Sequence, residues 1–253
     1  MALVTLEHLD GISTITLNRP DRLNAVSVAL LQDLHAAWVD AHAEPGTRVI
    51  VFAGAGRAFC AGDDLKEFDV QGQSAHSMHE MGDNIQRITR DIMFGPKLVI
   101  GAMQGYAVGA GFEWLLNCDM VVAADNLVCF FPEMGLGHFV TGGVTHLLPQ
   151  SLGNQRAMEW MVLGERQNAA TLHALGIVNR VVPLAELGPA ARALAQQVLA
   201  RSAHATAHLK RVVHSQVQTQ LNVALEAERQ AAFTCFQHPQ TAEQIRAFGK
   251  PRA

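Results

Sequence analysis

The sequence predicts an α/β fold followed by a helical C-terminal region. Short apolar runs of strand character alternate with segments of helical period up to about residue 200. Three segments after that point keep the helical period with no strand pattern among them, namely 203–218, 220–236 and 240–248. Alternating strands and helices are typical of an α/β core, whereas the late helices are too few to bury both of their faces alone. We therefore expect a core over residues 1–200 that carries the active site, and a C-terminal helical oligomerisation region over residues 201–253.

The N-terminal segment predicts a hairpin and a helix. The segments LVTLEHL and ISTITLN alternate apolar and polar residues on either side of Asp10-Gly11, a dipeptide typical of a two-residue hairpin turn. The run NRPD, which begins at Asn18, ends the second strand. Ser27 is a suitable N-cap for an amphipathic helix that extends to about His42.

The rest of the core alternates buried strands with helices. Continuous apolar runs bounded by glycine or polar residues predict the strands, and segments with apolar residues three or four apart predict the helices. The expected elements are, in order, a strand at 48–53, a loop over 54–82, a helix at 83–94, a strand at 98–103, a helix from near Gly109, the strands MVVAAD and LVCFF, helices from about Gly142, the strand IVNRVV and a helix at 184–200.

The composition narrows the class of protein. Of the 253 residues, 49% are hydrophobic, which is enough for one large domain with a substantial core. The four cysteines contain no closely spaced pair, so we expect no disulfide and a reducing compartment. The net charge is −4 and no basic block exceeds Lys210-Arg211, which disfavours nucleic acid as a partner.

The sequence predicts no secretory leader, membrane span or metal site. The N-terminal MALVTLEHLDG lacks a basic segment before a long apolar run. The uncharged run 98–112 is shorter than the roughly 20 residues that a membrane helix needs. His204 and His208 lie four residues apart, but no acidic or cysteine ligand stands near them. We expect a cytoplasmic protein.

One carboxylate, Glu113, stands in a stretch that is otherwise apolar or glycine. The sequence GYAVGAGFEWLL covers residues 105–116, and no charged residue lies between Lys97 and Glu113. Burying an ionised carboxylate is costly unless the group is paired or used. Glycine and alanine allow a substrate to approach the backbone, and such a turn can direct N–H groups toward a developing oxyanion. A second turn of this kind, AFCAGDDLKEF at 58–68, follows the first buried strand of the core.

The glycine spacing alone also fits a nucleotide-binding turn. GYAVGAG matches the GxxxGxG pattern of short-chain dehydrogenases, where the motif opens the fold, yet here it begins at Gly105. The only tyrosine, Tyr106, is followed four residues later by Ala110, so a Tyr-x-x-x-Lys motif is absent. A GxSxG serine hydrolase motif is absent as well. Both of these classes are disfavoured.

A second carboxylate strengthens the chemical interpretation. In CFFPEMGL, residues 129–136, Glu133 follows the end of an aromatic strand. Either glutamate alone is better explained as a helix cap or as the partner of an arginine. Two carboxylates in apolar settings that face one substrate can instead divide into acid and base. Because two turns could also polarise one thioester carbonyl, we favour a catalytic role for the two glutamates over a structural one.

The ordered motifs resemble those of the crotonase family, the enoyl-CoA hydratase/isomerase superfamily. The segments that carry the resemblance are NRPDRLNA (18–25), AFCAGDDLKEF (58–68), GYAVGAGFE (105–113), NCDMVVAAD (117–125), FPEMGLG (131–137) and AFGK near the end. They cover essentially the whole chain. The resemblance implies a crotonase-like spiral of ββα units with a C-terminal helical trimerisation region, assembled as a homotrimer or a dimer of trimers.

The resemblance also implies roles for single residues. The backbone N–H groups of the oxyanion hole fall on Asp63 and Ala110. The two catalytic glutamates fall on Glu113 and Glu133, which would hold the water, while Glu133 would exchange a proton with the α-carbon. The CoA-binding positions fall on Arg22, Leu23, Ala61, Lys66 and Lys250. No cofactor is expected, because coenzyme A is part of the acyl-CoA substrate.

The chain departs from the hydratase pattern at two places near these residues. Hydratases of the family carry PGxGGTQRL after the second glutamate, whereas this chain has GHFVTGGVTHLL with His138 and Phe139. Asp63 and Asp64 add charge to a turn that is usually small or apolar. We expect an enoyl-CoA hydratase; a Δ3-Δ2 or dienoyl isomerase of the same fold and a catalytically silent acyl-CoA binder remain the alternatives.

Overall fold

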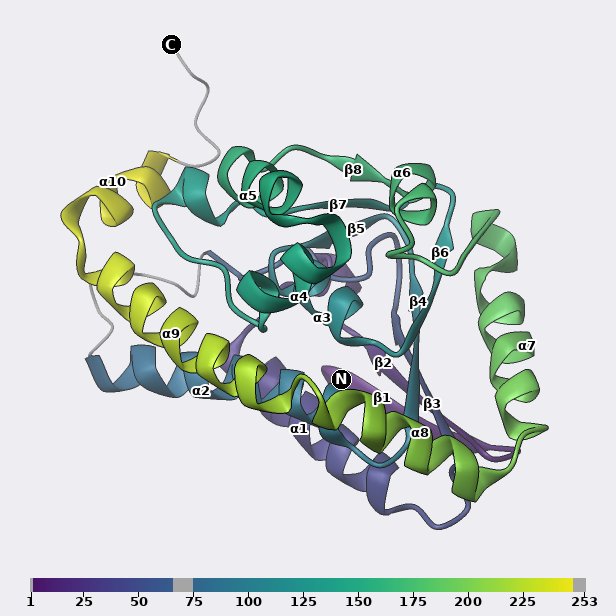
Figure 1. Ribbon diagram of the computed structural model, residues 1–253. Coiled ribbons are helices and arrows are strands. Elements are labelled where there is room, and N and C mark those ends of the chain that lie inside the picture. Colours follow the sequence, from purple (N-terminus) through teal and green to yellow (C-terminus); the bar gives the residue numbers. More distant parts are fainter. Residues whose placement is uncertain (1, 66–74, 248–253) are drawn as a thin grey trace.

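The computed structural model describes residues 2–65 and 75–247, which form two sheets surrounded by helices (Figure 1). The larger sheet has six strands in the order β1-β2-β3-β4-β6-β9. Its first pair is antiparallel and every other pair is parallel. Its strands are β1 (Val4–Leu9), β2 (Ile12–Leu17), β3 (Val49–Gly54), β4 (Leu98–Met103), β6 (Met120–Ala124) and β9 (Arg180–Val182).

The smaller sheet has three strands in the order β5-β7-β8. Its strands are β5 (Tyr106–Val108), β7 (Val128–Phe130) and β8 (Gln167–Asn168). The pair β5/β7 is parallel and the pair β7/β8 is antiparallel. The chain therefore leaves the large sheet after β4, adds β5 to the small sheet, and returns to the large sheet at β6. The glycine stretch and Glu133 both lie at the ends of these small-sheet strands.

The predicted hairpin and first helix are confirmed. Asp10 and Gly11 have φ of 51° and 81°, the left-handed values that a two-residue hairpin turn needs. Helix α1 (Val28–Ala43) begins after Ser27, whose Oγ accepts a hydrogen bond from the Leu30 N–H at 3.1 Å. This bond satisfies one of the N–H groups that the first turn of a helix leaves unpaired.

The two faces of the large sheet carry separate cores because consecutive strand residues point to opposite sides. On β3, Ile50 and Phe52 belong to the main core, which also contains Trp38 of α1 and Ile88 of α2 (Ala75–Phe94). The alternate residues of the strands pack with helix α7 (Leu187–Leu199) on the other face. The sheet is thus covered by α1 and α2 on one side and by α7 on the other.

The expected loop over 54–82 is partly wrong, because helix α2 begins at Ala75 rather than at residue 83. The first turns are rich in polar residues, and among the described side chains of the helix the apolar residues that face the core are Met81, Ile85, Ile88 and Ile92. Packing of α2 against α1 and α9 compensates for the weak local signal. The short strands β5 and β8 were not predicted either, whereas α6 (Ala169–Ala174) lies within the region predicted to be helical from about Gly142. The final strand, expected over IVNRVV, is limited to β9.

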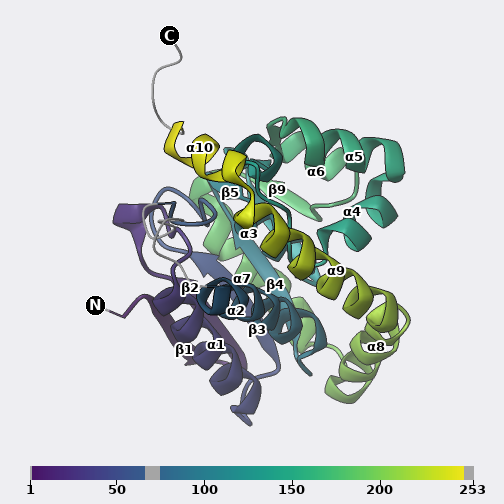
Figure 2. The same cartoon turned by 90° about the vertical axis from the view of Figure 1, so that its left-hand side faces the viewer.

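The predicted run of helices after Ala203 is confirmed. The helices are α8 (Ala203–Ser215), α9 (Gln218–Gln237) and α10 (Pro239–Ala247). Figure 2 shows α9 lying across the molecule between α2 and α4, both of which it contacts. The helices before this region that bear on the site are α3 (Ala110–Asn117), α4 (Val144–Leu152) and α5 (Asn154–Leu163). No helix among residues 2–65 and 75–247 is both long and apolar enough to cross a bilayer.

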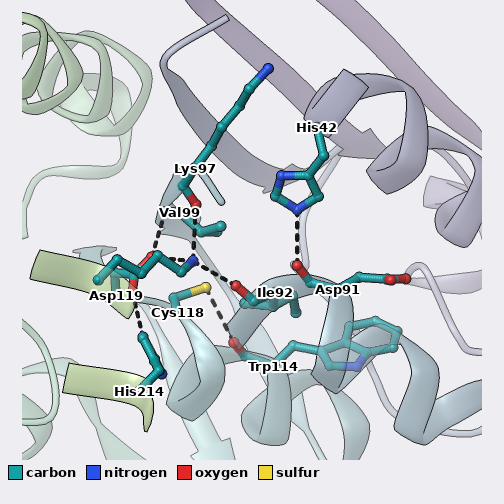
Figure 3. Close-up of polar contacts among 10 residues, drawn as sticks. His42, Asp91, Ile92, Lys97, Val99, Trp114, Cys118, Asp119 and His214 are labelled. Atoms are coloured by element: carbon teal, nitrogen blue, oxygen red, sulfur yellow. Dashed lines mark hydrogen bonds and ion pairs between the residues drawn. The ribbon is translucent and has the colours of Figure 1, made fainter. Parts of the chain in front are cut away.

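A buried ion pair fastens α8 to the core (Figure 3). Lys210, which is 4% exposed, donates from Nζ to the Ile92 and Lys97 carbonyls and to Asp119 Oδ2, at 2.8–2.9 Å. The second Asp119 oxygen accepts a hydrogen bond from His214 Nε2 at 2.8 Å. Lys210 and His214, both on α8, thus bind the same carboxylate, that of Asp119, just before β6.

Candidate active site

The two glycine turns predicted from the sequence lie against each other. The Cys60 N–H donates to the Tyr106 carbonyl and the Val108 N–H donates to the Cys60 carbonyl, both at 3.0 Å, which joins residues 58–60 to β5. Gly62 (φ +81°) and Gly109 (φ +52°) follow in the left-handed region that favours glycine. A Cβ on Gly109 would lie 3.8 Å from the Gly62 Cα. Asp63 and Ala110, which follow Gly62 and Gly109 in the sequence, therefore lie on adjoining turns.

The backbone N–H groups of Asp63 and Ala110 have no acceptor among the residues that the structure describes. Asp63 pairs with Val26 through the carbonyl of Gly62 and the amide of Asp64, so its own N–H takes no part in that bridge. Ala110 is the first residue of α3, a position whose N–H has no partner within the helix. Two unpaired donors on adjoining turns suit a developing oxyanion.

Glu113 lies one helical turn into α3 and is 1% exposed. Its Oε1 accepts a hydrogen bond from the Thr141 N–H at 2.7 Å, and its Oε2 accepts one from Thr141 Oγ1 at 2.9 Å. Burial raises the pKa of Glu113 to about 8, and the carboxylates of Glu228 and Asp63 add to the rise. The group is therefore oriented by a single threonine, whose two donors favour the ionised carboxylate while burial opposes it.

Glu133 opens a short 3-10 helix, Glu133–Leu136, directly after β7 and Phe131-Pro132. The residue is 7% exposed, and its Oε2 has no hydrogen-bond partner within the described part of the chain. Its Oε1 lies so close to Gly109 that a Cβ there would be 2.5 Å away. Burial raises the pKa of Glu133 well above its usual value, and Glu113 adds to this. Burial, and next to it the charge of Glu113, therefore disfavour the ionised form of Glu133.

Two further ionisable side chains, Asp63 and His138, lie beside the glutamates. His138 Nε2 and Asp63 Oδ2 are 3.9 Å apart. Burial raises the pKa of Asp63 to about 6 and lowers the pKa of His138 to about 4. The sequence pointed to both positions as departures from the family pattern, but it assigned no role to either side chain. The signal in the sequence that could have revealed this role was the charged residue Asp63 at a turn that is usually apolar in the family.

Three of the positions proposed for CoA lie together. The Ala61 N–H donates to the Leu23 carbonyl at 3.0 Å, and Leu23 has a left-handed φ of 53°. Arg22 precedes it and is exposed. Lys66 and Lys250 lie outside the described residues.

Asn24 holds the NRPDRLNA segment against the first glycine turn, a role that sequence reasoning missed. Its side chain is fully buried, and its Nδ2 lies within hydrogen-bonding distance of the carbonyls of Ala55, Ala58 and Phe59 at 2.9–3.0 Å. Its φ of 54° is left-handed, which asparagine tolerates better than most residues. This amide therefore helps to hold Leu23 beside Ala61, together with the backbone bonds between the two segments.

A narrow cavity of about 20 Å³, enough for about one water molecule, lies next to Thr141, the residue that bonds to Glu113. His138 and Thr141 form one wall, and helices α2 and α9 form the others. The residues from these helices are Met81, Gly82, Ile85, Gln86, Arg229, Ala232, Phe233 and Phe236. The His138 ring packs on Phe236 with centroids 4.1 Å apart. The wall of this cavity is mainly apolar.

Glu228, on α9, fixes the loop that orients Glu113, and the sequence offered no sign of it. The residue is 1% exposed and accepts hydrogen bonds from the Gly143 N–H, the Thr145 N–H and Thr145 Oγ1 at 2.6–2.8 Å. These groups lie at the start of α4, two and four residues after Thr141. A carboxylate at a helix N-terminus is favourably placed. The C-terminal helices therefore complete the wall and the support of this site.

Comparisons with known proteins agree in pointing to one family. A family model described as enoyl-CoA hydratase/isomerase matches residues 7–252. The chain is 35% identical over 171 residues to the mevalonyl-coenzyme A hydratase sidH of Aspergillus fumigatus, covering 68% of this chain and 63% of that protein, which is less than two thirds of its length. It is 30% identical over 251 residues to the probable enoyl-CoA hydratase echA8 of Mycobacterium tuberculosis, covering 99% and 96%. The crystal structure of an enoyl-CoA hydratase from Mycobacterium avium subsp. paratuberculosis K-10 superposes with a TM-score of 0.88 at 29% identity, covering 98% and 95%.

Proposed function

Because the chain belongs to the enoyl-CoA hydratase/isomerase family, we propose that it adds water to a trans-2-enoyl-CoA thioester to give a 3-hydroxyacyl-CoA. The observation that carries this proposal is the position of two buried carboxyl groups, Glu113 and Glu133, beside two unpaired backbone N–H groups. A protein that only binds acyl-CoA gains nothing from two buried carboxyl groups, which are costly to keep.

The thioester oxygen accepts hydrogen bonds from the N–H groups of Asp63 and Ala110 in this proposal. These donors stabilise the negative charge that moves onto the oxygen as the enolate forms. The same polarisation makes the β-carbon electrophilic, so that water can attack it. Arg22, Leu23 and Ala61 then lie along the path of the CoA moiety, to which Lys66 and Lys250 are also assigned.

The two glutamates divide the proton transfers. Glu113, oriented by Thr141, accepts a proton from the attacking water as the oxygen bonds to the β-carbon. Glu133, kept protonated by burial, donates its proton to the α-carbon. One water molecule is thereby added across the double bond, and a proton passes from Glu113 back to Glu133 to restore the enzyme.

A panel of trans-2-enoyl-CoA and trans-3-enoyl-CoA thioesters in heavy-oxygen water tests the reaction. Hydration introduces one labelled oxygen into the product, as detected by mass spectrometry. A shifted double bond without label would instead identify an isomerase. That alternative is favoured by one observation: Thr141 occupies both oxygens of Glu113, which leaves Glu133 as the carboxyl with an unpaired oxygen, and one glutamate suffices to move a proton. Binding of acyl-CoA without any turnover would contradict both.

We also propose a homotrimer or a dimer of trimers. The support is the run of helices from α8 to α10, whose outer faces carry exposed apolar side chains such as Leu209, Val212 and Val223. Light scattering of the purified protein measures the mass directly. A monomer would contradict this proposal and leave the proposed reaction unaffected.

A further inference from the structure

We propose that the side chains of Asp63 and His138 form a polar subsite that binds a hydroxyl group on the acyl part of the substrate. This inference rests on the proposed function, because it describes the acyl group that the same site accepts. It assigns to the Asp63 side chain a role that is separate from the role of its backbone N–H.

The first support is that these two side chains keep buried polar atoms without partners. Asp63 Oδ1 and His138 Nδ1 are both inaccessible to solvent, and neither has a hydrogen-bond partner in the described ranges. Their other polar atoms are 3.9 Å apart, which is too long for a hydrogen bond. Buried polar groups are nearly always paired, because an unpaired one costs free energy. A ligand group that bonds to both side chains removes that cost.

The second support is the position of the pair within the candidate active site. Asp63 carries the backbone N–H that we assign to the thioester oxygen. The backbone N–H of His138 donates to the Glu133 carbonyl at 2.8 Å, so the His138 side chain extends from the same short turn as the second glutamate. His138 also lines the narrow cavity between α2 and α9, together with Thr141. The pair therefore lies beside both the proposed thioester contact and the second glutamate.

The third support is the charge of the site, which argues against an anionic substituent. Asp63, Glu113 and Glu133 are all acidic, and burial keeps the His138 imidazole neutral by lowering its pKa to about 4. A carboxylate on the acyl group would be repelled by this acidic cluster, and the neutral His138 ring would provide no positive charge to bind it. Desolvating an ammonium group is also far more costly than desolvating a hydroxyl.

Two arginines of this region, Arg19 and Arg229, are engaged in ion pairs. Arg19 pairs with Asp64 at 3.0 Å, and Arg229 at the outer wall of the cavity pairs with Glu226 at 2.7 Å. A hydroxyl group needs no such cation, since it both donates and accepts a hydrogen bond. It can donate to the Asp63 carboxylate while it accepts a hydrogen bond from the ring N–H of His138. The chemistry of the pair thus matches a neutral hydroxyl.

The test uses matched pairs of enoyl-CoA thioesters of one chain length, with and without a hydroxyl group at carbon 4, 5 or 6. We expect kcat/KM of the full chain to favour at least one hydroxylated member by at least ~10-fold, the value of one well-formed hydrogen bond in a buried site. A ratio near one for every pair would show that an ordered water fills the gap, and it would overturn the proposal.

Two variants locate the preference. Asp63→Ala keeps the backbone N–H and removes the carboxyl group, and His138→Phe keeps a ring of similar size without its nitrogens. In both, the ratio of kcat/KM between the paired substrates should fall toward one. Because the ratio is taken within one variant, a general loss of activity cancels. Asp64→Asn, which removes a charge one residue away on the Arg19 side, should keep the wild-type ratio. An unchanged ratio in Asp63→Ala and His138→Phe would contradict the subsite.

Binding of saturated thioesters separates this inference from the proposed reaction. Calorimetry compares 5-hydroxypentanoyl-CoA with pentanoyl-CoA, and the 4- and 6-hydroxy pairs likewise, none of which can be hydrated. Tighter binding of a hydroxylated member by the wild type, lost in His138→Phe, would support the subsite even if no enoyl-CoA were hydrated. Hydration of enoyl-CoA with no hydroxyl preference in either assay would leave the reaction established and the subsite refuted.

Discussion

The molecule buries two groups of ionisable side chains that differ in how their polar atoms are paired. Around Asp119, a lysine faces a carboxylate, the Lys210 Nζ has three acceptors, and both carboxylate oxygens have donors. The Val99 N–H adds a further bond to Asp119 at 2.7 Å. Only the outer ring nitrogen of His214, Nδ1, is without a partner among the described residues of this group. This pairing balances the charge and attaches α8 to the core.

The candidate active site has the opposite character. Its carboxyl groups come from Asp63, Glu113 and Glu133, and its fourth member, His138, is neutral. One polar atom each of Asp63, Glu133 and His138 is buried without a partner in the part of the chain that the structure covers. Such an arrangement lowers stability, and buried groups of this kind are most often found at functional sites. The difference separates a fully paired cluster, which stabilises the fold, from the cluster that we propose as the catalytic site.

The largest effect should follow from breaking the paired cluster. Lys210→Met keeps the length of the side chain but leaves Asp119 without its lysine, and we expect a loss of about 3–5 kcal/mol in the free energy of unfolding. Urea denaturation measures this loss. The folded fraction should keep its kcat, because the cluster lies apart from the proposed chemistry. A large fall in kcat at unchanged stability would remove the distinction between the two clusters.

The unpaired cluster should respond in the reverse way. Glu113→Gln and Glu133→Gln should each lower kcat for hydration by at least ~10²-fold, as expected for a positioned acid or base. The free energy of unfolding should stay the same or rise, because a neutral amide is less costly to bury than a carboxylate. Acyl-CoA binding should survive, since the CoA contacts lie elsewhere. Near wild-type hydration by either variant would exclude that residue from the chemistry.

Removing one backbone donor tests the oxyanion hole apart from the carboxyl groups. Ala110→Pro deletes the N–H at the first position of α3, where proline is often tolerated. Loss of one such donor costs on the order of 3 kcal/mol, or a ~100-fold slower turnover. Ala110→Gly keeps the N–H and should change activity little. Circular dichroism and the assembled mass must match the wild type, and a folded proline variant with full activity would show that this turn is structural only.

Glu228 is intermediate between the paired cluster around Asp119 and the unpaired cluster of the candidate active site. It is buried and both of its oxygens accept hydrogen bonds, but its donors are neutral N–H and O–H groups rather than a cation. In Glu228→Gln the amide offers one acceptor in place of two, so we expect a loss of about 1–3 kcal/mol in stability. Loosening of Thr141 should also lower kcat more than it raises KM. Glu226→Gln on the same helix, whose carboxylate is exposed, is the matched control and should stay within about 0.5 kcal/mol of the wild type. Equal effects of both variants would argue against a positioning role for Glu228.

The pH dependence of stability gives a contrast within the wild-type protein itself. Burial raises the pKa of Glu113 to about 8 and that of Asp63 to about 6, so the folded state holds protons that the unfolded state releases near pH 4. Stability is therefore highest in mild acid and falls as the pH rises toward 8, by at most about 1.4 kcal/mol per pH unit for each group. Unfolding measured from pH 5 to 8.5 should show this fall, and Glu113→Gln should flatten it. An identical slope in the variant would locate the titration elsewhere.

The sequence by itself determined the order of most elements, because their signals are local. The Asp10-Gly11 turn, the Ser27 cap and the apolar run at 98–103 each depend on a few adjacent residues, and each was confirmed. The resemblance to the crotonase family also predicted the fold and the two candidate glutamates, since the motifs occur in a fixed order along the chain. The adjoining position of the two glycine turns was predicted in the same way, and Gly62 and Gly109 do lie together.

Only the tertiary structure decided what surrounds each glutamate. Thr141 meets Glu113 across 28 positions of sequence, and Glu228 reaches Gly143 across 85, distances over which no local pattern carries information. The same holds for the approach of His138 to Asp63 and for the start of α2, which packing against α1 and α9 stabilises despite a polar first turn. Pairing, burial and the resulting pKa values depend on atoms that meet in space, and those contacts exist only once the chain has folded.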